Sequence, residues 1–338
     1  MRTLIIAEAG VNHNGSLERA HKLVEAAALA GVDIVKFQTF KAESLVSLSA
    51  KKAEYQTRNI NDGDDSQYAM LKRLEMPESW HHELMAHCAE VGVRFLSTGF
   101  DEESVDLLHT LGSPLYKIPS GEITNRPYLE HIARLGRPVI LSTGMATLDE
   151  VREAADVLYA AGLGRGELTV LHCNTEYPTP MADVNLRAML QIRDELDVHV
   201  GYSDHTLGIE VPIAAVAMGA VVIEKHFTLD KGLPGPDHRA SLEPHELTAM
   251  VKAIRNIEQA LGSATKEPSP SELPNRAIAR KSIHLRHALK SGQVIAMEDL
   301  IMLRPGDGLS PMRIDEVVGK KAQRDIVEGH KLSEADLS

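Results

Sequence analysis

The amino-acid sequence predicts a parallel (β/α)8 barrel of the TIM type, followed by a small second domain. Up to about residue 262, short apolar runs rich in β-branched residues alternate with longer stretches of helical period. Polar residues follow directly after these runs in all parts of the chain, as a ring of βα loops requires. A doubly wound sheet is the alternative, and the even spread of polar residues favours the barrel.

Eight runs are predicted as strands, each with room for a crossover helix after it. They are Leu4–Ala7, Ile34–Phe37, Arg94–Leu96, Leu115–Ile118, Val139–Leu141, Leu168–Leu171, Val198–Gly201 and Val221–Glu224. The longest loop, Thr39–Met76, follows the second strand. A long insertion is more often functional than idle, although a partly disordered surface excursion is the other interpretation.

The barrel is predicted to occupy residues 1–262, with a linker at 263–278 and a cap domain at 279–338. Three prolines with Ser, Thr and Lys mark the linker. Within the cap, His287–Leu300 and Arg324–Leu337 align without gaps as two copies of one unit. A duplicated unit this small has little core, so we expect it to pack on another surface.

Composition narrows the class of protein. The net charge is −12, which argues against nucleic acid or an anionic membrane as the main partner. The two cysteines, Cys88 and Cys173, suit a reducing compartment. No run resembles a membrane span or a signal peptide, so the expectation is a soluble cytoplasmic protein.

Two strand-end lysines indicate an anion site. Lys36 and Lys117 lie on strands that are buried on both faces, where a charge is costly unless it meets a ligand or partner. Ser120 and Ser142 follow neighbouring strands beside glycines, so backbone N–H groups can approach a phosphate there. The alternative is a pair of structural salt bridges to Glu8 or Glu122.

Two histidines indicate a divalent metal. His205 ends the seventh strand and His226 the eighth, so a barrel makes them neighbours. Two imidazoles with water and nearby carboxylates suit manganese or magnesium better than structural zinc. The weaker candidates are His13, His172 and His238. The loop after the eighth strand adds Asp237 and Arg239, which could grip sugar hydroxyls or an acidic substrate, or could be solvated turn charges.

These residues fall in motifs that resemble sialic acid synthases, the N-acetylneuraminate synthase family, over essentially the whole chain. The motifs are IIAEAGVNHNGS at 5–16, VKFQTF at 35–40, YKIPSGE at 116–122, LSTGMAT at 141–147, YPTP at 177–180, GYSDHTLG at 201–208, IEKHFTLD at 223–230, GPDH at 235–238 and RPGDG at 304–308.

The resemblance implies a TIM barrel with an antifreeze-like (SAF) cap domain, in a domain-swapped homodimer whose caps cover the partner's active site. It implies that His205 and His226 bind manganese or magnesium and that Glu8, Lys36 and Lys117 are catalytic. The residues implied to bind phosphoenolpyruvate are Lys36, Lys117, Ser120, Ser142, Ser203 and either Asn174 or Thr175. Those implied to bind the sugar are Gln38, Glu122, Tyr177, Asp237 and, from the other subunit, Arg304.

One departure concerns the residues before YPTP. Neuraminate synthases tend to carry Asn two positions before the Tyr, whereas Thr175 stands there in this chain and Asn174 precedes it. The runs KFQTFKAE, PSGEITN and GPDHRASLEP are more similar to the legionaminate synthase branch. That branch takes 2,4-diacetamido-2,4,6-trideoxymannose in place of N-acetylmannosamine, and both sugars remain open here.

The predicted reaction joins carbon three of phosphoenolpyruvate to the aldehyde of the open-chain sugar, with water capturing carbon two and phosphate leaving. Two other functions stay open. A keto-acid lyase or aldolase on the same barrel could use a strand-end lysine as a Schiff base. A carbohydrate- or ice-binding protein could use the barrel only as a scaffold.

Overall fold

The computed structural model describes residues 2–338 and contains two compact units, residues 1–262 and 263–338. The first unit holds an eight-stranded sheet with the strand order β3-β2-β1-β8-β7-β6-β5-β4. All paired strands are parallel. The two end strands, β3 and β4, contact each other, so the sheet closes. The predicted barrel is confirmed.

Most strands extend further toward their carboxyl ends than the sequence pattern indicates. Their bounds are β1 Leu4–Gly10, β2 Ile34–Thr39, β3 Arg94–Gly99, β4 Tyr116–Ile118, β5 Val139–Ser142, β6 Leu168–Cys173, β7 His199–Asp204 and β8 Val222–His226. Glu8, Gln38, Ser142, Ser203 and His226 lie beyond the predicted strand bounds, and the structure places all five within the strands.

Alternate residues of each strand point into the barrel, and they form one apolar layer followed by one polar layer. Ile6, Ile34, Leu96, Ile140, Leu171 and Val222 form one buried apolar cluster from six strands. Two residues further along, on the same face, the strands present Glu8, Lys36, Thr98, Ser142, Cys173 and Glu224. An apolar plug thus fills the barrel directly beneath a polar layer.

Helices cover the outer face of the sheet. They are α1 Leu17–Ala30, α5 Glu78–Val91, α6 Glu102–Thr110, α7 Arg126–Arg134, α8 Leu148–Ala160, α9 Arg187–Leu196, α10 Glu210–Ala217 and α11 Pro244–Leu261. Helix α1 shows how the sequence sets them. Ser16 caps its start by accepting from Arg19 N, Gly31 ends it at a φ of 78°, and Leu23, Val24 and Ala27 bury one face.

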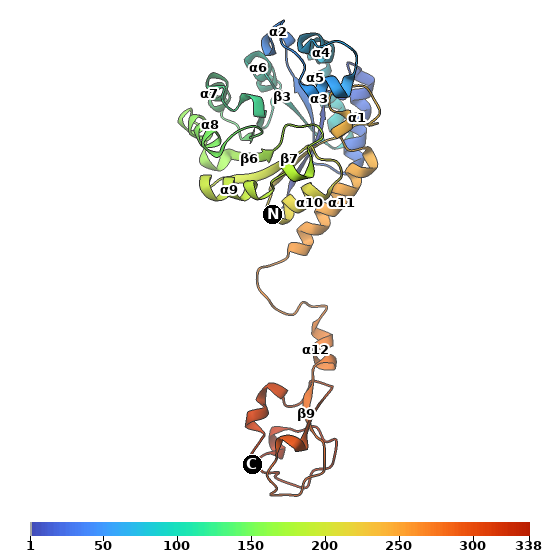
Figure 1. The fold of residues 1–338 in the computed structure, drawn as a ribbon, viewed down its shortest axis with the longest axis vertical. Coiled ribbons are helices and arrows are strands. Elements are labelled where there is room, and N and C mark those ends of the chain that lie inside the picture. Colours follow the sequence, from blue (N-terminus) through green and yellow to red (C-terminus); the bar gives the residue numbers. More distant parts are fainter. Residues whose placement is uncertain (1) are drawn as a thin grey trace. The chain divides into compact units, whose positions relative to one another are not determined.

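The insertion after β2 is folded and contains three short helices: α2 Ala42–Leu45, α3 Glu54–Ile60 and α4 Gln67–Leu74. Helices α2 and α4 contact each other (Figure 1). Val11, Phe40, Met70 and Leu74 form a buried apolar cluster that joins the insertion to the ends of β1 and β2. The interpretation as a disordered excursion is therefore wrong.

The second unit has its own small apolar core. Its antiparallel strands are β9 Ser282–Leu285 and β10 Leu300–Leu303. The end of the predicted linker is helical, because α12 spans Leu273–Ala279. The two sequence copies pair symmetrically: Leu289 and Ile326, which hold the same place in each copy, form a mutual bridge. The repeat found in the sequence of the second unit is therefore also a repeat in its structure.

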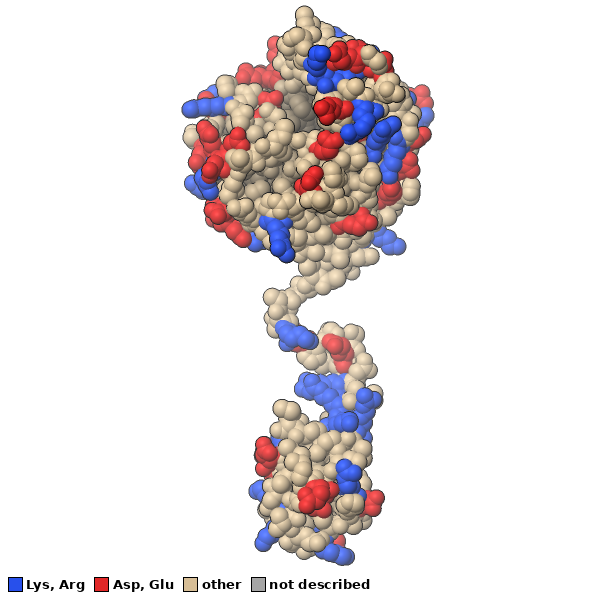
Figure 2. All heavy atoms as spheres, viewed as in Figure 1, with Lys and Arg blue, Asp and Glu red and all other residues tan. Residues whose placement is uncertain are grey.

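Across residues 2–338 we find no helix with both the length and the apolar character needed to cross a membrane. Acidic and basic side chains are interspersed on the face of the first unit drawn in Figure 2.

Candidate active site

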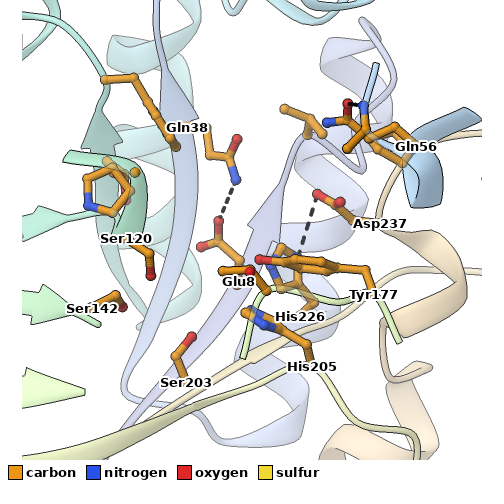
Figure 3. A pocket seen from close by; sticks show the side chains of 18 of the residues that line it. Glu8, Gln38, Gln56, Ser120, Ser142, Tyr177, Ser203, His205, His226 and Asp237 are labelled. Atoms are coloured by element: carbon orange, nitrogen blue, oxygen red, sulfur yellow. Dashed lines mark hydrogen bonds and ion pairs between the residues drawn. The ribbon is translucent and has the colours of Figure 1, made fainter. Parts of the chain in front are cut away.

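A cavity of about 700 Å³ opens in the first unit at the carboxyl ends of the strands. Active sites of this fold lie at that end of the barrel. The cavity brings together thirteen of the fifteen predicted site residues: Glu8, Lys36, Gln38, Lys117, Ser120, Glu122, Ser142, Thr175, Tyr177, Ser203, His205, His226 and Asp237. Figure 3 shows Ser120, Ser142 and Ser203 on one side, with Tyr177, His205, His226 and Asp237 on the other.

Four charged groups form a buried cluster on the floor of the cavity. The Lys36 ammonium lies 2.6 Å from Glu8 Oε2 and 3.5 Å from Glu224 Oε2. The Lys117 ammonium lies 3.5 Å from the other oxygen of Glu224. All four side chains are at most 6% exposed. The expectation of salt bridges to Glu8 is thus met for Lys36, but the group shared by both lysines is Glu224, whereas Glu122 accepts from Asn125 at the rim.

The charged states follow from this geometry. Burial acts to raise the pKa of Glu224, but Lys117, Lys36 and the Ser203 hydroxyl outweigh it and hold that pKa at about 2. Burial acts to lower the pKa of Lys36, but Glu224 and Glu8 outweigh it and raise that pKa. Burial lowers the pKa of Lys117, against the pull of Glu224. Burial also raises the pKa of Glu8, although Lys36 opposes it. Glu8 is therefore the more basic of the two carboxylates.

Hydroxyl groups surround the two ammonium groups. Lys117 donates to Ser142 Oγ at 2.7 Å, and Lys36 donates to Thr98 Oγ1 at 2.9 Å. Gly144 N donates to Ser120 Oγ at 2.9 Å. A Cβ at Gly144 would lie 2.4 Å from Thr175 Cγ2, so only glycine allows this close approach. Two ammonium groups with converging hydroxyls can hold a phosphate and a carboxylate.

His205 and His226 lie side by side, as predicted, with ring centroids 5.3 Å apart. His205 Nδ1 contacts the carbonyl oxygen of Asn174, which leaves Nε2 available. His226 Nδ1 is buried without a hydrogen-bond partner. Burial lowers the pKa of His205 to about 4 and that of His226 well below its usual range, helped for His226 by the neighbouring His205. Both imidazoles are therefore neutral at neutral pH.

This arrangement fits a divalent cation held by two imidazoles. Neutral imidazole is the metal-binding form of histidine, and the buried nitrogen of His226 has no hydrogen-bond partner in the protein. Within residues 2–338, no group of three or more His, Cys, Asp or Glu side chains converges for metal binding. A metal here would need water or substrate oxygens as its further ligands, as in catalytic rather than structural sites.

An aromatic side chain extends the histidine pair. The Tyr177 ring stacks on His205 with centroids 4.0 Å apart, and Tyr55 of the insertion stacks on Tyr177 at 4.9 Å. Asp237 Oδ2 lies 3.9 Å from His226 Nδ1. Burial, with the nearby Glu8, raises the pKa of Asp237 to about 7. Asp237 can therefore be present either as a hydrogen-bond donor or as an acceptor near neutral pH.

Gln38 Nε2 donates to Glu8 Oε1 at 3.1 Å and fixes that carboxylate (Figure 3). The backbone beside it requires glycine: Gly10 has a φ of 52°, and a Cβ there would lie 3.2 Å from Glu8 Oε1 and 3.4 Å from His226 Cε1.

Two predicted residues lie outside the cavity. Asn174 Oδ1 accepts from Glu176 N at 2.8 Å and from Thr179 Oγ1 at 3.3 Å, so this side chain shapes the loop. Of the Asn174–Thr175 alternatives, only Thr175 lines the cavity. Arg304 is exposed in the second unit and is not a residue of this cavity.

The weaker histidine candidates do not line the cavity either. His172 Nε2 contacts the carbonyl oxygen of Val184, and His238 Nδ1 contacts Thr228 Oγ1 at 2.7 Å. His13 is buried, and its Nδ1 accepts from Gly15 N. Arg239 is also absent from the lining.

The sequence pattern placed Thr98 and Glu224 among the polar residues at the strand ends, with Glu224 as one of the carboxylates near the metal, but it assigned neither a binding role; Cys173 and Gln56 were given no place in the site. All four line the cavity. Thr98, Cys173 and Glu224 carry a usable signal in the sequence, because each lies two residues beyond an apolar residue of the barrel plug. Gln56 has no such signal, because nothing in the sequence places the insertion over the barrel.

Comparison with known proteins places this geometry in a family. The sequence model of the NeuB family matches residues 23–266, and that of the SAF domain matches residues 280–338. The chain is 51% identical to an N,N'-diacetyllegionaminic acid synthase of Campylobacter jejuni, over 98% of this chain and 99% of that protein. It is 52% identical to the protein of that name from Legionella pneumophila, over 98% and 94%.

Among solved structures, the N-acetylneuraminic acid (sialic acid) synthetase of Leptospira borgpetersenii, in complex with citrate, superposes with a TM-score of 0.71 at 33% identity. The match covers 81% of this chain and 90% of that one. With the barrel, the paired lysines and the paired histidines in place, this chain belongs to the NeuB family and carries a C-terminal SAF domain.

Proposed function

We propose that this protein condenses phosphoenolpyruvate with 2,4-diacetamido-2,4,6-trideoxymannose and water to give N,N'-diacetyllegionaminic acid and phosphate. The observation that carries the proposal is the joining, in one cavity, of a cationic hydroxyl-lined end and a neutral histidine pair. The full-length similarity to N,N'-diacetyllegionaminic acid synthases favours this sugar over N-acetylmannosamine.

Lys36 and Lys117 would hold the phosphate and carboxylate groups of phosphoenolpyruvate. They are fixed by Glu224 and by hydroxyls before substrate arrives, so the positive charge is preorganised where the substrate's negative charge gathers. The Ser120 and Ser142 hydroxyls and Thr175 complete this end. Bound there, phosphoenolpyruvate would have its carbon three facing the rest of the cavity.

The aldehyde of the open-chain sugar would lie beside His205 and His226. Carbon three of phosphoenolpyruvate forms a bond to the aldehyde carbon, and the aldehyde oxygen takes up a proton to become a hydroxyl. Water then adds to carbon two. The bond between carbon two and the phosphate oxygen then breaks, so that phosphate leaves and carbon two becomes the keto carbon.

Glu8 would take the proton from the attacking water. Its pKa is raised by burial, so it is a better base than Glu224, and Gln38 orients one of its oxygens. Asp237 and Tyr177 flank the histidine pair and would contact the sugar. Glu122, at the rim, would contact it from the other side.

His205 and His226 would hold a manganese or magnesium ion, which when bound polarises a carbonyl oxygen. The histidines need no proton to be lost before metal binds near neutral pH, because burial keeps both neutral.

We further propose a cytoplasmic, domain-swapped homodimer in which Arg304 of the partner subunit reaches the acetamido carbonyl of the sugar. The exposed position of Arg304, outside the barrel cavity, supports a role toward another chain. Both cysteines are free and buried, as suits a reducing compartment.

The experiment is phosphate release from phosphoenolpyruvate with Mn²⁺, comparing the diacetamido sugar with N-acetylmannosamine and with no sugar. We expect release that depends on both substrates and is faster with the diacetamido sugar. Preference for N-acetylmannosamine would make the enzyme a neuraminate synthase, and release without any sugar would overturn the condensation.

A further inference from the structure

One wall of the cavity is apolar. Its side chains come from the ends of β1, β2 and β3 and from the insertion that follows β2. They are Val11, Phe40, Leu45, Val46, Met70, Leu71, Leu74 and Phe100. Val11, Phe40, Met70 and Leu74 are buried, while Leu45, Leu71 and Phe100 are half-buried and pack against them. We refer to these eight residues as the apolar wall.

The apolar wall lies nearer the mouth of the barrel than the charged cluster on the cavity floor. Val11, Phe40 and Phe100 follow the carboxyl ends of β1, β2 and β3, beyond the inward-facing strand residues that form the floor, and the insertion supplies the rest of the wall. A sugar whose aldehyde lies beside the histidine pair has its distal carbons free to extend over β1–β3. The far end of such a sugar, pointing toward the mouth, would therefore meet the apolar wall.

The insertion is held in place over the mouth. Asn59 Nδ2 donates to the carbonyl oxygens of Pro236 at 2.7 Å and Tyr177 at 3.3 Å. Arg58 pairs with Glu176 at 2.8 Å. These contacts join the insertion to the loops after β6 and β8, so the apolar wall is a fixed surface of the cavity.

The polar side chains of the insertion do little to change the character of this wall. Gln56 Oε1 already accepts from Ala53 N at 2.9 Å, and the Tyr55 ring is stacked on Tyr177. Glu54 and Gln67 also line the cavity, and they are exposed and half-buried respectively. The apolar wall itself offers a sugar hydroxyl no side-chain hydrogen-bond partner.

We propose that the apolar wall selects the acceptor sugar by taking the C6 methyl group of a 6-deoxy sugar and disfavouring a C6 hydroxyl. This inference rests on the proposed function. A methyl group gains from burial against Leu and Phe side chains, whereas a hydroxyl buried there loses its bonds to water. An apolar pocket discriminates such pairs by roughly 10- to 100-fold.

The test compares 2,4-diacetamido-2,4,6-trideoxymannose with its 6-hydroxy counterpart, by kcat/KM for phosphate release at saturating phosphoenolpyruvate. For the wild type we expect a preference for the deoxy sugar of about 10-fold or more. Leu71→Asn places a hydrogen-bonding group on the apolar wall, and we expect the preference to fall to within about twofold, with the KM for phosphoenolpyruvate unchanged.

Ile60→Asn is the matched control. Ile60 belongs to the same apolar cluster and the same insertion but does not line the cavity. The variant should lose a similar amount of packing and keep the wild-type preference. Leu45→Asn, also on the apolar wall and half-buried, repeats the test if the Leu71 variant fails to fold.

The outcomes separate the two proposals. If neither sugar supports phosphate release, the proposed function is refuted. Release without a preference in the wild type, or an equal loss of preference in the Leu71 and Ile60 variants, would overturn the apolar-wall inference while the condensation stands.

Discussion

Replacing Lys117 by Met tests the role of the cationic end of the cavity. Methionine has similar volume and no charge, so the change removes the ammonium with little change in packing. That ammonium donates to Ser142 at 2.7 Å, lies 3.5 Å from Glu224 and is on a side chain only 4% exposed. Glu224 retains Lys36 at 3.5 Å and Ser203 at 2.8 Å, so its charge is not left without a partner.

The expected losses of folding stability and of kcat/KM follow from these contacts. Because Glu224 keeps two partners, the loss of folding stability should be below the roughly 3–5 kcal/mol of a fully broken buried pair, at about 2 kcal/mol. The bound substrate anion loses a buried charged partner, at about 3 kcal/mol, which is roughly 150-fold in kcat/KM for phosphoenolpyruvate. The assay is steady-state phosphate release, with urea unfolding to establish the folded fraction.

Lys52→Met is the control for this variant. The Lys52 side chain is fully buried and pairs with Asp62 at 2.7 Å, but it does not line the cavity. This variant should be destabilised and keep its KM for phosphoenolpyruvate. If Lys117→Met stays within threefold of the wild type in kcat/KM, the assignment of the cationic end to phosphoenolpyruvate is wrong.

Three further predictions concern the base, the metal and the second unit. Glu8→Gln should lower kcat by about 10²- to 10⁴-fold while phosphoenolpyruvate still binds, as measured by calorimetry, because the isosteric amide cannot accept the proton; unchanged turnover would exclude Glu8 as the base. EDTA should abolish phosphate release and Mn²⁺ should restore it, and electron paramagnetic resonance should show weaker Mn²⁺ binding in His205→Ala; metal-independent turnover would contradict the histidine site. Asp336→Asn should destabilise the second unit by about 1–2 kcal/mol at pH 7, since Asp336 accepts from Arg324, His330 and Ser333. Burial alone would raise the pKa of Asp336, but the hydrogen bonds from His330, Ser333 and Arg324 outweigh it and hold that pKa well below 3.8. The folded-state pKa is thus depressed, so its stabilisation is present above about pH 4 and is lost as the pH falls below that. The gap between wild type and variant in urea unfolding should therefore narrow as the pH falls from about 5 to about 3, and a gap of unchanged size over that range would refute this reasoning.

The barrel was predictable because its pattern is local. Each strand carries its own apolar run, and each run is followed by polar residues that a closed parallel sheet must bring together. The ends of the strands were less predictable. Polar residues such as Glu8 and Ser203 interrupt the apolar pattern, yet they continue the strand because they face a cavity. The polar residues that line the cavity therefore make the strands look shorter in the sequence than they are in the structure.

The contacts between site residues were harder to foresee than the residues themselves. Glu224 was visible at a strand end, but its position between Lys36 and Lys117 depends on the register of three separate strands. Asn174 and Thr175 are adjacent in sequence, and only the turn decides which of them faces the cavity. Asn174 faces the loop because its side chain satisfies Glu176 N and Thr179 Oγ1.

The insertion is the part of the fold that local sequence pattern predicts least well. Its helices are four to eight residues long and have little helical stability of their own. They are held by long-range contacts such as that from Asn59 to the carbonyl oxygen of Pro236, which no sequence spacing indicates. The side chains that we propose to select the sugar therefore emerge only from the three-dimensional structure.

The central claim is that one cavity joins carbon three of phosphoenolpyruvate to the aldehyde carbon of an aminosugar. The most direct measurement is carbon-13 NMR of the product formed from phosphoenolpyruvate labelled at carbon three and 2,4-diacetamido-2,4,6-trideoxymannose labelled at carbon one. We predict a one-bond coupling between the two labels in the product, with one phosphate released per bond. Phosphate release with labelled pyruvate and unchanged sugar, and no coupling, would contradict it.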